Sequence, residues 1–354
     1  MSEYPHHIAL LGVGTIGLSM LALHLRRPDT QVTIYDPRPD YESLLRSQLP
    51  HFLDASPDAH DTDAVATLLA SPRLALAPTL HAAVHTATII QEQTPEHLAS
   101  KQALWTDVAR SAPPSAHLWS SSSGIPASAQ AAPCDASVAA RLLVAHPFNP
   151  PHVMPLVEIV PGPHTAADRV AFAAEYFAAV PGPASSPCTS VQGVSATAPT
   201  ATQHYRPITL HKEVPGFVGN RLAFALLREA CSLVGEGVVS ARDLDALVVG
   251  SLGPRWAGSG VFESYHAGGG EGGIGAFLQK LAPTVKDVWA DLGQVDIRTE
   301  EERMRAESDG EKEKWREMVV RQTEEAYGSS TSAEQRQKKD RMLRGVIELQ
   351  KRCL

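Results

Sequence analysis

A histidine and a glutamate lie on either side of a proline-rich turn in the middle of this 354-residue chain. His146 ends one apolar run, and Glu158 lies inside the next one. A histidine that transfers protons needs a partner that holds its tautomer and stabilises its charged form, and a carboxylate does both. The sequence therefore predicts a proton-transferring pair at these two positions.

The amino-terminal end carries a glycine pattern that is typical of dinucleotide binding. A short apolar run leads into Gly12, Gly14 and Gly17, and an apolar helical stretch follows. The glycines allow a tight turn and a close approach of the backbone to a pyrophosphate at the start of the helix. The next β-rich run ends at Asp36, and an acid there binds the adenosine ribose and repels a 2′-phosphate. The pattern favours NAD over NADP, although Arg38 could soften that preference.

Two further groups of polar residues follow predicted strands. Glu96 and Lys101 come after the apolar run 87–92, and a serine run occupies positions 120–123. The carboxyl ends of parallel strands face the ligand crevice in open α/β sheets. Glu96 and Lys101 could therefore contact the nicotinamide ribose, and one serine hydroxyl could reach the substrate oxygen. The spacing equally allows a helix-capping acid with a solvated lysine, and a solvated serine loop.

The elements that would position these residues form two domains. Short β-rich runs alternate with helical stretches up to about residue 187, as in a doubly wound sheet. Residues 188–207 are rich in Ser, Thr, Ala and Pro and predict an exposed or disordered loop. The expected fold is an α/β N-terminal Rossmann domain over 1–187, this loop, and an all-α C-terminal domain over 208–354 that binds substrate and dimerises. Residues from about 298 form a charged tail that is expected to be helical.

One apolar stripe in the helical part predicts a buried helix face. Its members recur at near-helical spacing and are Leu222, Ala225, Leu226, Ala230 and Leu233.

The composition excludes several classes of partner. A formal net charge of −8 argues against nucleic acid, because proteins that bind phosphate backbones carry a basic surface. No run of about 20 apolar residues predicts a membrane span, and no secretory signal is visible. The four cysteines show no CxxC or Cys/His spacing, so no metal site is expected. The expected location is the cytoplasm.

A series of motifs follows a specific order between about residues 7 and 290. They are Gly12-x-Gly14-x-x-Gly17, the segment 91–96, the serine run 120–123, the pair 145–151 and 155–161, and the segments 214–222 and 236–245. In this order the chain resembles the 3-hydroxyacyl-CoA dehydrogenase superfamily, and within it the L-gulonate 3-dehydrogenase (lambda-crystallin) branch. Relatives in that family connect the region 183–207 more directly.

This resemblance implies a role for each matching position. His146 would be the general base that takes the hydroxyl proton, and Glu158 would orient it and stabilise its charged form. Asn220 and Ser123 would hydrogen-bond the reacting oxygen. The cofactor contacts that the family implies are Thr15, Ile16, Asp36, Glu96 and Lys101. The family commonly dimerises through its helical domain, so a homodimer is expected.

The choice of substrate rests on a single arginine and on the resemblance. Arg255 lies where acyl-CoA enzymes of the family carry a small or apolar Gly-Pro turn, and its guanidinium could bind a carboxylate bidentately. Residues 37–60 hold no lysine and only Arg38 and Arg46, which is a poor anchor for CoA phosphates. A small 3-hydroxy acid, with L-gulonate favoured, is therefore expected. An acyl-CoA substrate, a carnitine-like acid and a non-catalytic NAD-binding protein remain alternatives.

Overall fold

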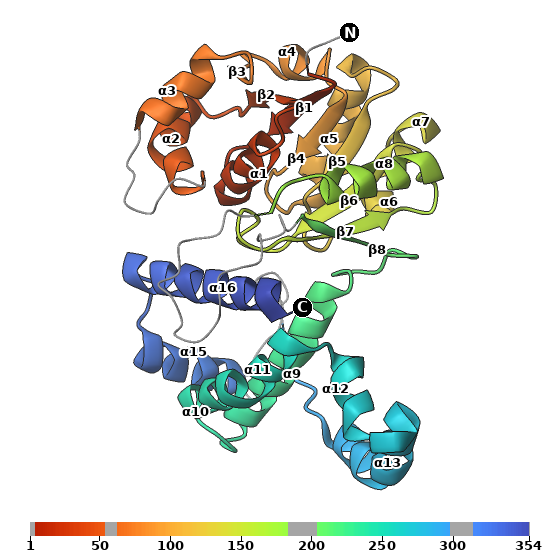
Figure 1. Cartoon of the computed structure of the whole chain (residues 1–354), viewed down its shortest axis with the longest axis vertical. Helices are drawn as coiled ribbons and strands as arrows, with labels where there is room; N and C mark the ends of the chain where they lie inside the picture. Colours follow the sequence, from red (N-terminus) through yellow and green to blue (C-terminus); the bar gives the residue numbers. More distant parts are fainter. Residues whose placement is uncertain (1–3, 54–61, 183–203, 298–313, 354) are drawn as a thin grey trace, which may run out of the picture. The chain divides into compact units, whose positions relative to one another are not determined.

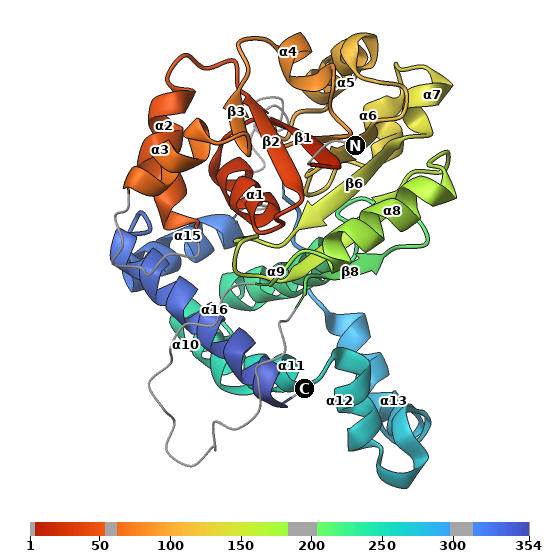
Figure 2. The same ribbon diagram turned by 45° about the horizontal axis from the view of Figure 1, so that its top comes forward.

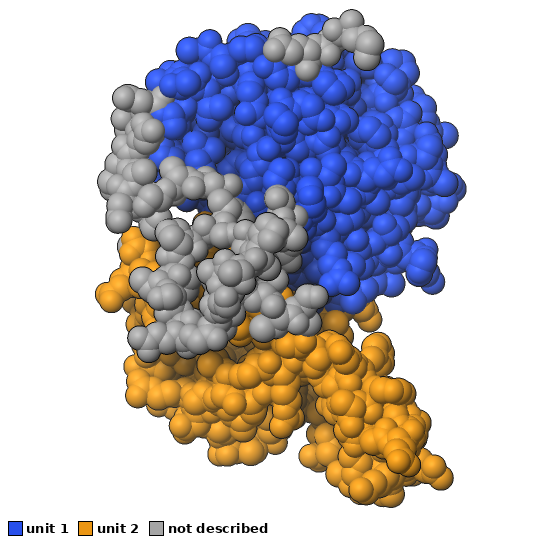
Figure 3. All heavy atoms as spheres, in the orientation of Figure 1, with its two compact units in different colours: residues 1–220 blue, residues 221–354 orange. Residues whose placement is uncertain are grey.

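The computed structural model describes residues 4–53, 62–182, 204–297 and 314–353. The chain divides into two compact units, residues 1–220 and 221–354 (Figure 3). This division comes later than the expected start of the helical domain at residue 208. The reason is that strand β8 (Arg206–Thr209) pairs with strand β7 (Leu156–Pro161) and so belongs to the sheet. Residues 188–203 of the expected loop lie outside the described residues. At its end the prediction of an exposed loop is wrong, because Tyr205 is buried and Arg206 and Pro207 belong to β8.

An eight-stranded sheet forms the centre of the first unit, in the order β3-β2-β1-β4-β5-β6-β7-β8 (Figure 1). The other strands are β1 (His6–Leu11), β2 (Thr30–Tyr35), β3 (Leu74–Leu76), β4 (Ile89–Glu92), β5 (His117–Ser120) and β6 (Leu142–Pro147). Strands β1 to β6 are parallel, β7 is antiparallel to β6, and β8 is parallel to β7. The prediction of an α/β Rossmann domain followed by a helical domain is confirmed.

Helices cover both faces of this sheet (Figures 1 and 2). One core contains residues of α1 (Thr15–Leu25), α2 (Tyr41–Gln48), α3 (Thr62–Ala70) and α8 (Ala167–Ala178). The other contains residues of α4 (Leu80–Val84), α5 (Leu98–Ser111), α6 (Ala127–Ala131) and α7 (Ala136–Ala139). Side chains alternate between the faces of a strand. In β1 this alternation sends Ile8 and Leu10 to the first core and Ala9 and Leu11 to the second. A strand buried on both faces therefore reads as an unbroken apolar run.

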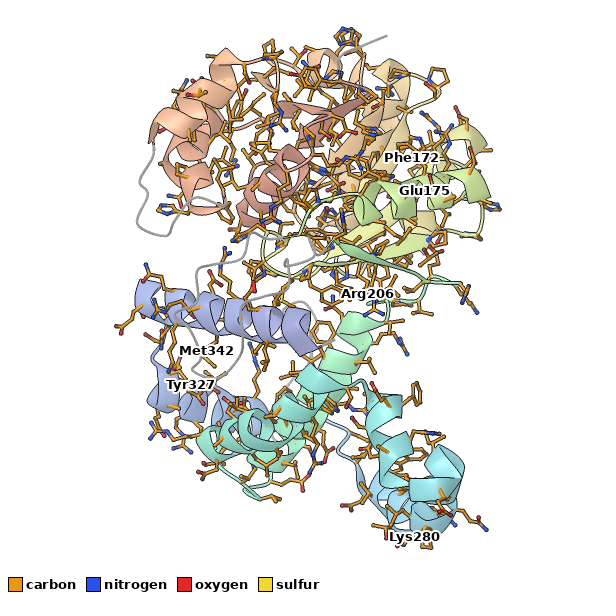
Figure 4. The ribbon with its side chains drawn as sticks, in the orientation of Figure 1. Phe172, Glu175, Arg206, Lys280, Tyr327 and Met342 are labelled. Atoms are coloured by element: carbon orange, nitrogen blue, oxygen red, sulfur yellow. The ribbon has the colours of Figure 1, made fainter. Side chains whose placement is uncertain are left out.

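Helix α8 shows how an amphipathic pattern places a helix on the sheet. Its Phe172 ring stacks on His117 of β5 with ring centroids 3.8 Å apart, and Tyr176 and Phe177 are buried. Glu175, three positions after Phe172, is exposed (both are labelled in Figure 4). The apolar face thus meets the sheet and the charged face meets solvent.

The second unit is helical. Its helices are α9 (Gly219–Gly235), which begins at the end of the first unit, α10 (Ala241–Leu247), α11 (Gly253–Gly258), α12 (Val261–Gly268), α13 (Gly273–Asp291), α15 (Lys314–Tyr327) and α16 (Ala333–Cys353), with short helical turns at Val248–Leu252 and Gly270–Gly272. Tyr327 of α15 (labelled in Figure 4) donates to Asp245 of α10 at 2.7 Å, and Gln350 of α16 donates to the Ala257 carbonyl at 2.6 Å. The charged tail is helical over α15 and α16 and non-helical at 328–332, and 298–313 lie outside the described residues.

The prediction that α9 buries an apolar face is wrong among the described residues. Leu222, Ala225 and Leu226 are exposed, and Ala230 and Leu233 are only half-buried. Helical spacing marks an apolar face but does not say whether the same chain covers it. None of the described helices is both long and apolar enough to cross a membrane.

Candidate active site

The predicted proton-transferring pair forms across two adjacent strands. Because β6 and β7 are antiparallel, His146 and Glu158 lie directly opposite each other in the sheet. The two atoms His146 Nδ1 and Glu158 Oε2 are 2.8 Å apart, and both side chains are buried. The antiparallel reversal between β6 and β7 brings the two side chains together although twelve positions separate them in sequence.

Backbone amides hold the other oxygen of Glu158. Val218 N and Gly219 N donate to its Oε1 at 3.0 and 2.9 Å. Burial alone would raise the pKa of Glu158, but the hydrogen bond from His146 and those from the two amides outweigh it, and the pKa is lowered. An ionised Glu158 can only accept hydrogen bonds, so the imidazole carries its proton on Nδ1 and presents the lone pair of Nε2.

A strained turn presents these amides. Gly216 has φ of 74° and Phe217 has φ of 53°, and the left-handed region is costly for a residue with a side chain. The Phe217 ring is fully buried, with its centroid 5.5 Å from that of His146. Phe148 lies on the same imidazole at 5.2 Å and is half-buried. Sequence reasoning assigned no role to the two rings or the two amides, although Phe148 lies in the motif 145–151 and Phe217, Val218 and Gly219 lie in the motif 214–222.

Ser123 and Asn220 come together as the family resemblance implied. Asn220 Nδ2 donates to the Ser123 carbonyl at 2.7 Å. Asn220 also follows Gly219, whose amide binds Glu158, so the pair is tied to the histidine through the turn. Ser123 is exposed and Asn220 is half-buried, which leaves polar atoms of both residues accessible. All of these residues belong to the first unit.

Lys101 and Glu96 are engaged in the protein. Lys101 is almost completely buried and donates to Glu92 Oε1 at 2.6 Å and to the Thr94 carbonyl at 3.1 Å. Glu96 Oε1 accepts from the amides of Ser123 and Gly124, both at 3.0 Å, and from the Ser122 hydroxyl.

Glu92 is a second residue that sequence reasoning missed. Besides Lys101 it accepts from Ser120 Oγ and from the amide and hydroxyl of Thr94, all at 2.6 Å. This network holds the ends of β4 and β5 and the loop that carries Ser123.

The glycine turn fits a dinucleotide. A Cβ on Gly17 would lie 2.1 Å from the Gly12 carbonyl oxygen, and one on Gly12 would lie 3.1 Å from the Gln93 carbonyl oxygen. A Cβ on Gly14 would meet no atom within 4 Å, so space is open where a pyrophosphate would lie. Helix α1 starts there with no side-chain cap and no acid in its first turn, which leaves its amides for an anion. Thr15 and Ile16 are the first residues of that helix.

Asp36 follows β2 as expected. It is buried and accepts from Val13 N at 2.9 Å and from the Arg38 side chain. Burial alone would raise the pKa of Asp36, but the hydrogen bonds from Arg38 and Val13 N outweigh it and lower the pKa.

Arg255 lies outside this group of residues. It is exposed on α11 in the second unit. Among the described residues, no cluster of three or more His, Cys, Asp or Glu side chains could hold a metal ion.

Comparisons with known proteins agree with this arrangement. Residues 7–183 match the NAD-binding domain of 3-hydroxyacyl-CoA dehydrogenase, and residues 216–294 match its C-terminal domain. The chain is 35% identical to an L-carnitine dehydrogenase of Streptomyces coelicolor over 296 residues, which are 83% of each protein. It is also 35% identical to a 3-hydroxyacyl-CoA dehydrogenase of Gibberella moniliformis over 300 residues, 82% of this chain and 81% of that protein.

A solved structure shows the same fold over nearly the whole chain. It is that of 5-formyl-3-hydroxy-2-methylpyridine 4-carboxylic acid 5-dehydrogenase, with a TM-score of 0.68, 23% identity, and 98% of both chains covered. The turn for the pyrophosphate, the acid after β2 and the buried histidine–carboxylate pair thus occur in a chain whose two halves match both domains of one enzyme family. The chain therefore belongs to the 3-hydroxyacyl-CoA dehydrogenase family and is an NAD-dependent dehydrogenase of 3-hydroxy acids or their thioesters.

Proposed function

We propose that this enzyme oxidises the 3-hydroxyl group of a small free hydroxy acid, with His146 as the general base. The observation that carries this proposal is the His146–Glu158 hydrogen bond of 2.8 Å, which leaves Nε2 of a buried imidazole available. Nε2 takes the hydroxyl proton, and Glu158 stabilises the imidazolium that results. NAD, when bound, supplies the hydride acceptor.

The other predicted site residues take positioning roles in this proposal. The Asn220 amide and the Ser123 hydroxyl hydrogen-bond the reacting oxygen from beside the turn that holds Glu158. The start of α1, at Thr15 and Ile16, binds the pyrophosphate. Glu96 and Lys101 act on the nicotinamide ribose end indirectly. Glu96 holds the Ser122–Gly124 loop in place by accepting from its amides. Lys101 is bound to Glu92 and so supports the strand end from which this loop starts.

L-Carnitine is the first substrate candidate. Several relatives that are 31–35% identical to this chain are named L-carnitine dehydrogenases. Carnitine is a 3-hydroxy acid with a quaternary ammonium group, and such groups bind to aromatic faces by cation–π attraction. Phe148 is a half-buried aromatic ring beside His146, so it is the side chain we assign to that group.

L-Gulonate is the second candidate, because the order of the motifs resembles that branch. A 3-hydroxyacyl-CoA is the third, because one relative is named a 3-hydroxyacyl-CoA dehydrogenase.

Arg255 would bind the carboxylate of a free acid. If Arg255→Ala left KM for the acid unchanged, this role of Arg255 would be wrong.

The discriminating experiment follows NADH absorbance with L-carnitine, L-gulonate, 3-hydroxybutyrate and 3-hydroxybutyryl-CoA. Turnover of a free acid supports the proposal, whereas turnover of the thioester alone contradicts it. NADH binding with no turnover of any of the four would favour a non-catalytic protein.

Phe148→Leu sharpens the choice between the two acids. It removes a cation–π contact worth about 0.5–2 kcal/mol, so KM for carnitine should rise about 2- to 30-fold. KM for L-gulonate, which has no ammonium group, serves as the internal control and should change much less. An equal change for both would show that Phe148 acts only by packing on His146.

We also propose that two copies of the chain associate through α12 and α13. These helices pack on each other and lie apart from α15 and α16 in both views (Figures 1 and 2). Yet Phe262 is 78% exposed and Trp289 is 70% exposed. A hollow of about 370 Å³ on α13 is lined by Leu278, Ala282, Val285, Lys286 and Trp289. Exposed apolar surface on this scale is typical of a protein interface, and a second copy carries the same patch.

The test is the molar mass in solution by light scattering. Phe262→Glu should convert a dimer to a monomer at micromolar concentration. Lys280→Glu is the control, since Lys280 (labelled in Figure 4) is exposed on α13, the helix that carries Trp289, and does not line the hollow. A wild-type monomer would contradict the proposal.

A further inference from the structure

The carboxylate expected to bind the adenosine ribose is saturated by hydrogen bonds from the protein. Asp36 Oδ1 accepts from Arg38 N at 3.0 Å and from Arg38 Nε at 2.8 Å. Asp36 Oδ2 accepts from Val13 N at 2.9 Å and from Arg38 Nη2 at 2.7 Å. A carboxylate offers about four lone-pair sites, so Asp36 has none left for a ribose hydroxyl.

Two of these bonds are fixed and two are removable. The amides of Val13 and Arg38 belong to the turns after β1 and β2. The guanidinium of Arg38, in contrast, ends a side chain that is 46% exposed, so it can leave without unfolding anything. A ribose hydroxyl can donate to Asp36 only when this guanidinium moves away. Only the Arg38 end of this ion pair is exposed, since the Asp36 side chain is 5% exposed, so the ribose hydroxyls that replace the guanidinium must satisfy the buried carboxylate in its place.

The same guanidinium is suited to a phosphate. Arg38 already makes a bidentate contact with a carboxylate, and the planar fork of arginine binds phosphate oxygens in the same way. The guanidinium lies next to Asp36, the carboxylate that the 2′-position of the adenosine ribose must approach. Asp36 and the exposed Asp40 close by keep negative charge there and oppose a phosphate.

We propose that Arg38 is a cofactor-selecting residue that opens a subsite for the 2′-phosphate of NADP beside the NAD site. With NAD, Arg38 swings off Asp36 and the ribose hydroxyls take its place. With NADP, Arg38 moves from Asp36 to the phosphate. The enzyme consequently binds both dinucleotides, NAD more tightly, and Asp36 and Arg38 act in opposite directions on the preference.

Direct binding tests this without any turnover. The fluorescence of NADH and of NADPH is titrated with the full-length wild type and with Arg38→Ala. The NADPH dissociation constant should rise about 10- to 100-fold in Arg38→Ala, as expected for loss of a bidentate charged contact. The NADH constant should stay the same or fall a few-fold, because a competitor for Asp36 is gone.

Arg46→Ala is the matched control. Arg46 is also half-exposed and pairs with a carboxylate, Glu42, at 2.7 Å, and its removal changes the net charge equally. It should leave both dissociation constants unchanged. Arg38→Gln, which keeps hydrogen-bonding ability without charge, should behave as Arg38→Ala does.

Three outcomes would overturn the proposal. They are a wild type that does not bind NADPH, an Arg38→Ala variant with an unchanged ratio of the two constants, and an Arg38→Gln variant that retains NADPH. Asp36→Asn should move the ratio in the opposite direction, toward NADPH. Thermal unfolding of each variant checks that it is folded.

Discussion

Two buried glutamates at the same edge of the sheet have different kinds of partner. Glu92, at the end of β4, accepts from the side chains of Lys101, Ser120 and Thr94 and from the Thr94 amide. Glu158, in β7, accepts from two backbone amides and from Nδ1 of His146, an imidazole that has a second ring nitrogen. Both carboxylates are fully satisfied, so burial and hydrogen bonding alone do not distinguish them.

The difference is what the partner can still do. Lys101 has used its donors inside the protein, and Glu92 therefore acts as a fastener between strand ends and loops. His146 uses only Nδ1 on Glu158 and has a second nitrogen for the substrate. A buried carboxylate thus indicates chemistry when its partner has another polar atom available for a substrate, and indicates architecture when the polar atoms of its partner are bound within the protein.

The largest effect on turnover should come from removing His146, the partner of Glu158. His146→Ala should lower kcat/KM by about 10²- to 10⁴-fold, the contribution of a positioned general base. NADH binding should persist, since the glycine turn is untouched. The measurement is steady-state kinetics together with NADH titration. His81→Ala, an exposed histidine on α4, is the control and should have full activity. A variant that kept even a tenth of the activity would show that another group takes the proton.

Removing the charge of Glu92 should lower the free energy of unfolding. Glu92→Gln removes the close counter-ion of the buried Lys101 ammonium and leaves only Glu96 Oε2 at 3.6 Å, and breaking a buried pair in this way costs about 3–5 kcal/mol. Urea unfolding measures the loss. Glu42→Gln breaks the half-exposed pair with Arg46 and should cost less than about 1 kcal/mol. Equal losses in the two variants would contradict the role given to Glu92.

Glu158→Gln should lower kcat by about 100-fold, because the amide no longer stabilises the imidazolium. Its stability loss should be smaller than that of Glu92→Gln, since the amide oxygen can still accept from Val218 N and Gly219 N. The ratio of kinetic to stability effects in the two glutamine variants is the measurement. The comparison fails if Glu158→Gln lowers the free energy of unfolding by more than it raises the activation free energy of turnover.

A smaller effect should come from a histidine that has no carboxylate partner. Burial, followed by the charge of Arg27, lowers the pKa of His24 to about 3. Its Nδ1 meets the Tyr176 hydroxyl at 2.8 Å, and its Nε2 has no hydrogen-bond partner among the described residues. The unfolded chain binds a proton there below its ordinary pKa of 6.5, and the folded chain does not.

The free energy of unfolding should therefore fall as the pH drops below 6.5, by about 1.4 kcal/mol per pH unit for this residue. Urea unfolding at pH 7.5, 6 and 5 gives the slope. His24→Gln keeps a hydrogen bond to Tyr176 but does not titrate, so its slope should be shallower by that amount. His117, whose pKa is lowered to about 4 by burial and by Arg169, should supply part of the slope that remains. An unchanged slope in His24→Gln would rule out this role of His24.

The sequence was sufficient where a function depends on local order. The glycine turn, the acid after β2, and the alternation of strands and helices are all read within about 30 residues, and each is present in the structure. His146 and Glu158 were also found from sequence, because a single turn joins their strands. The expected buried stripe on α9 was wrong, because its apolar pattern does not say which surface will cover it.

Long-range contacts decided the rest. Glu92 looked like one polar residue at the end of an apolar run, and only the pairing of β4 with β5 brings Ser120 onto it. The amides that hold Glu158 come from a turn about sixty positions later, and their direction depends on a left-handed Phe217. The sequence places Arg38 two positions after Asp36, but it does not show that the guanidinium donates to both carboxylate oxygens.

The sequence by itself determined the fold class, the cofactor and the histidine–glutamate pair, because each is encoded in residue types at short and regular spacing. The order of the motifs gave the family, but several relatives are named L-carnitine dehydrogenases and none of those named above is a gulonate dehydrogenase. The tertiary structure alone decided which buried carboxylate fastens the sheet and which one serves a base. That distinction depends on which donors surround each oxygen, and most of those donors come from segments far away in the chain.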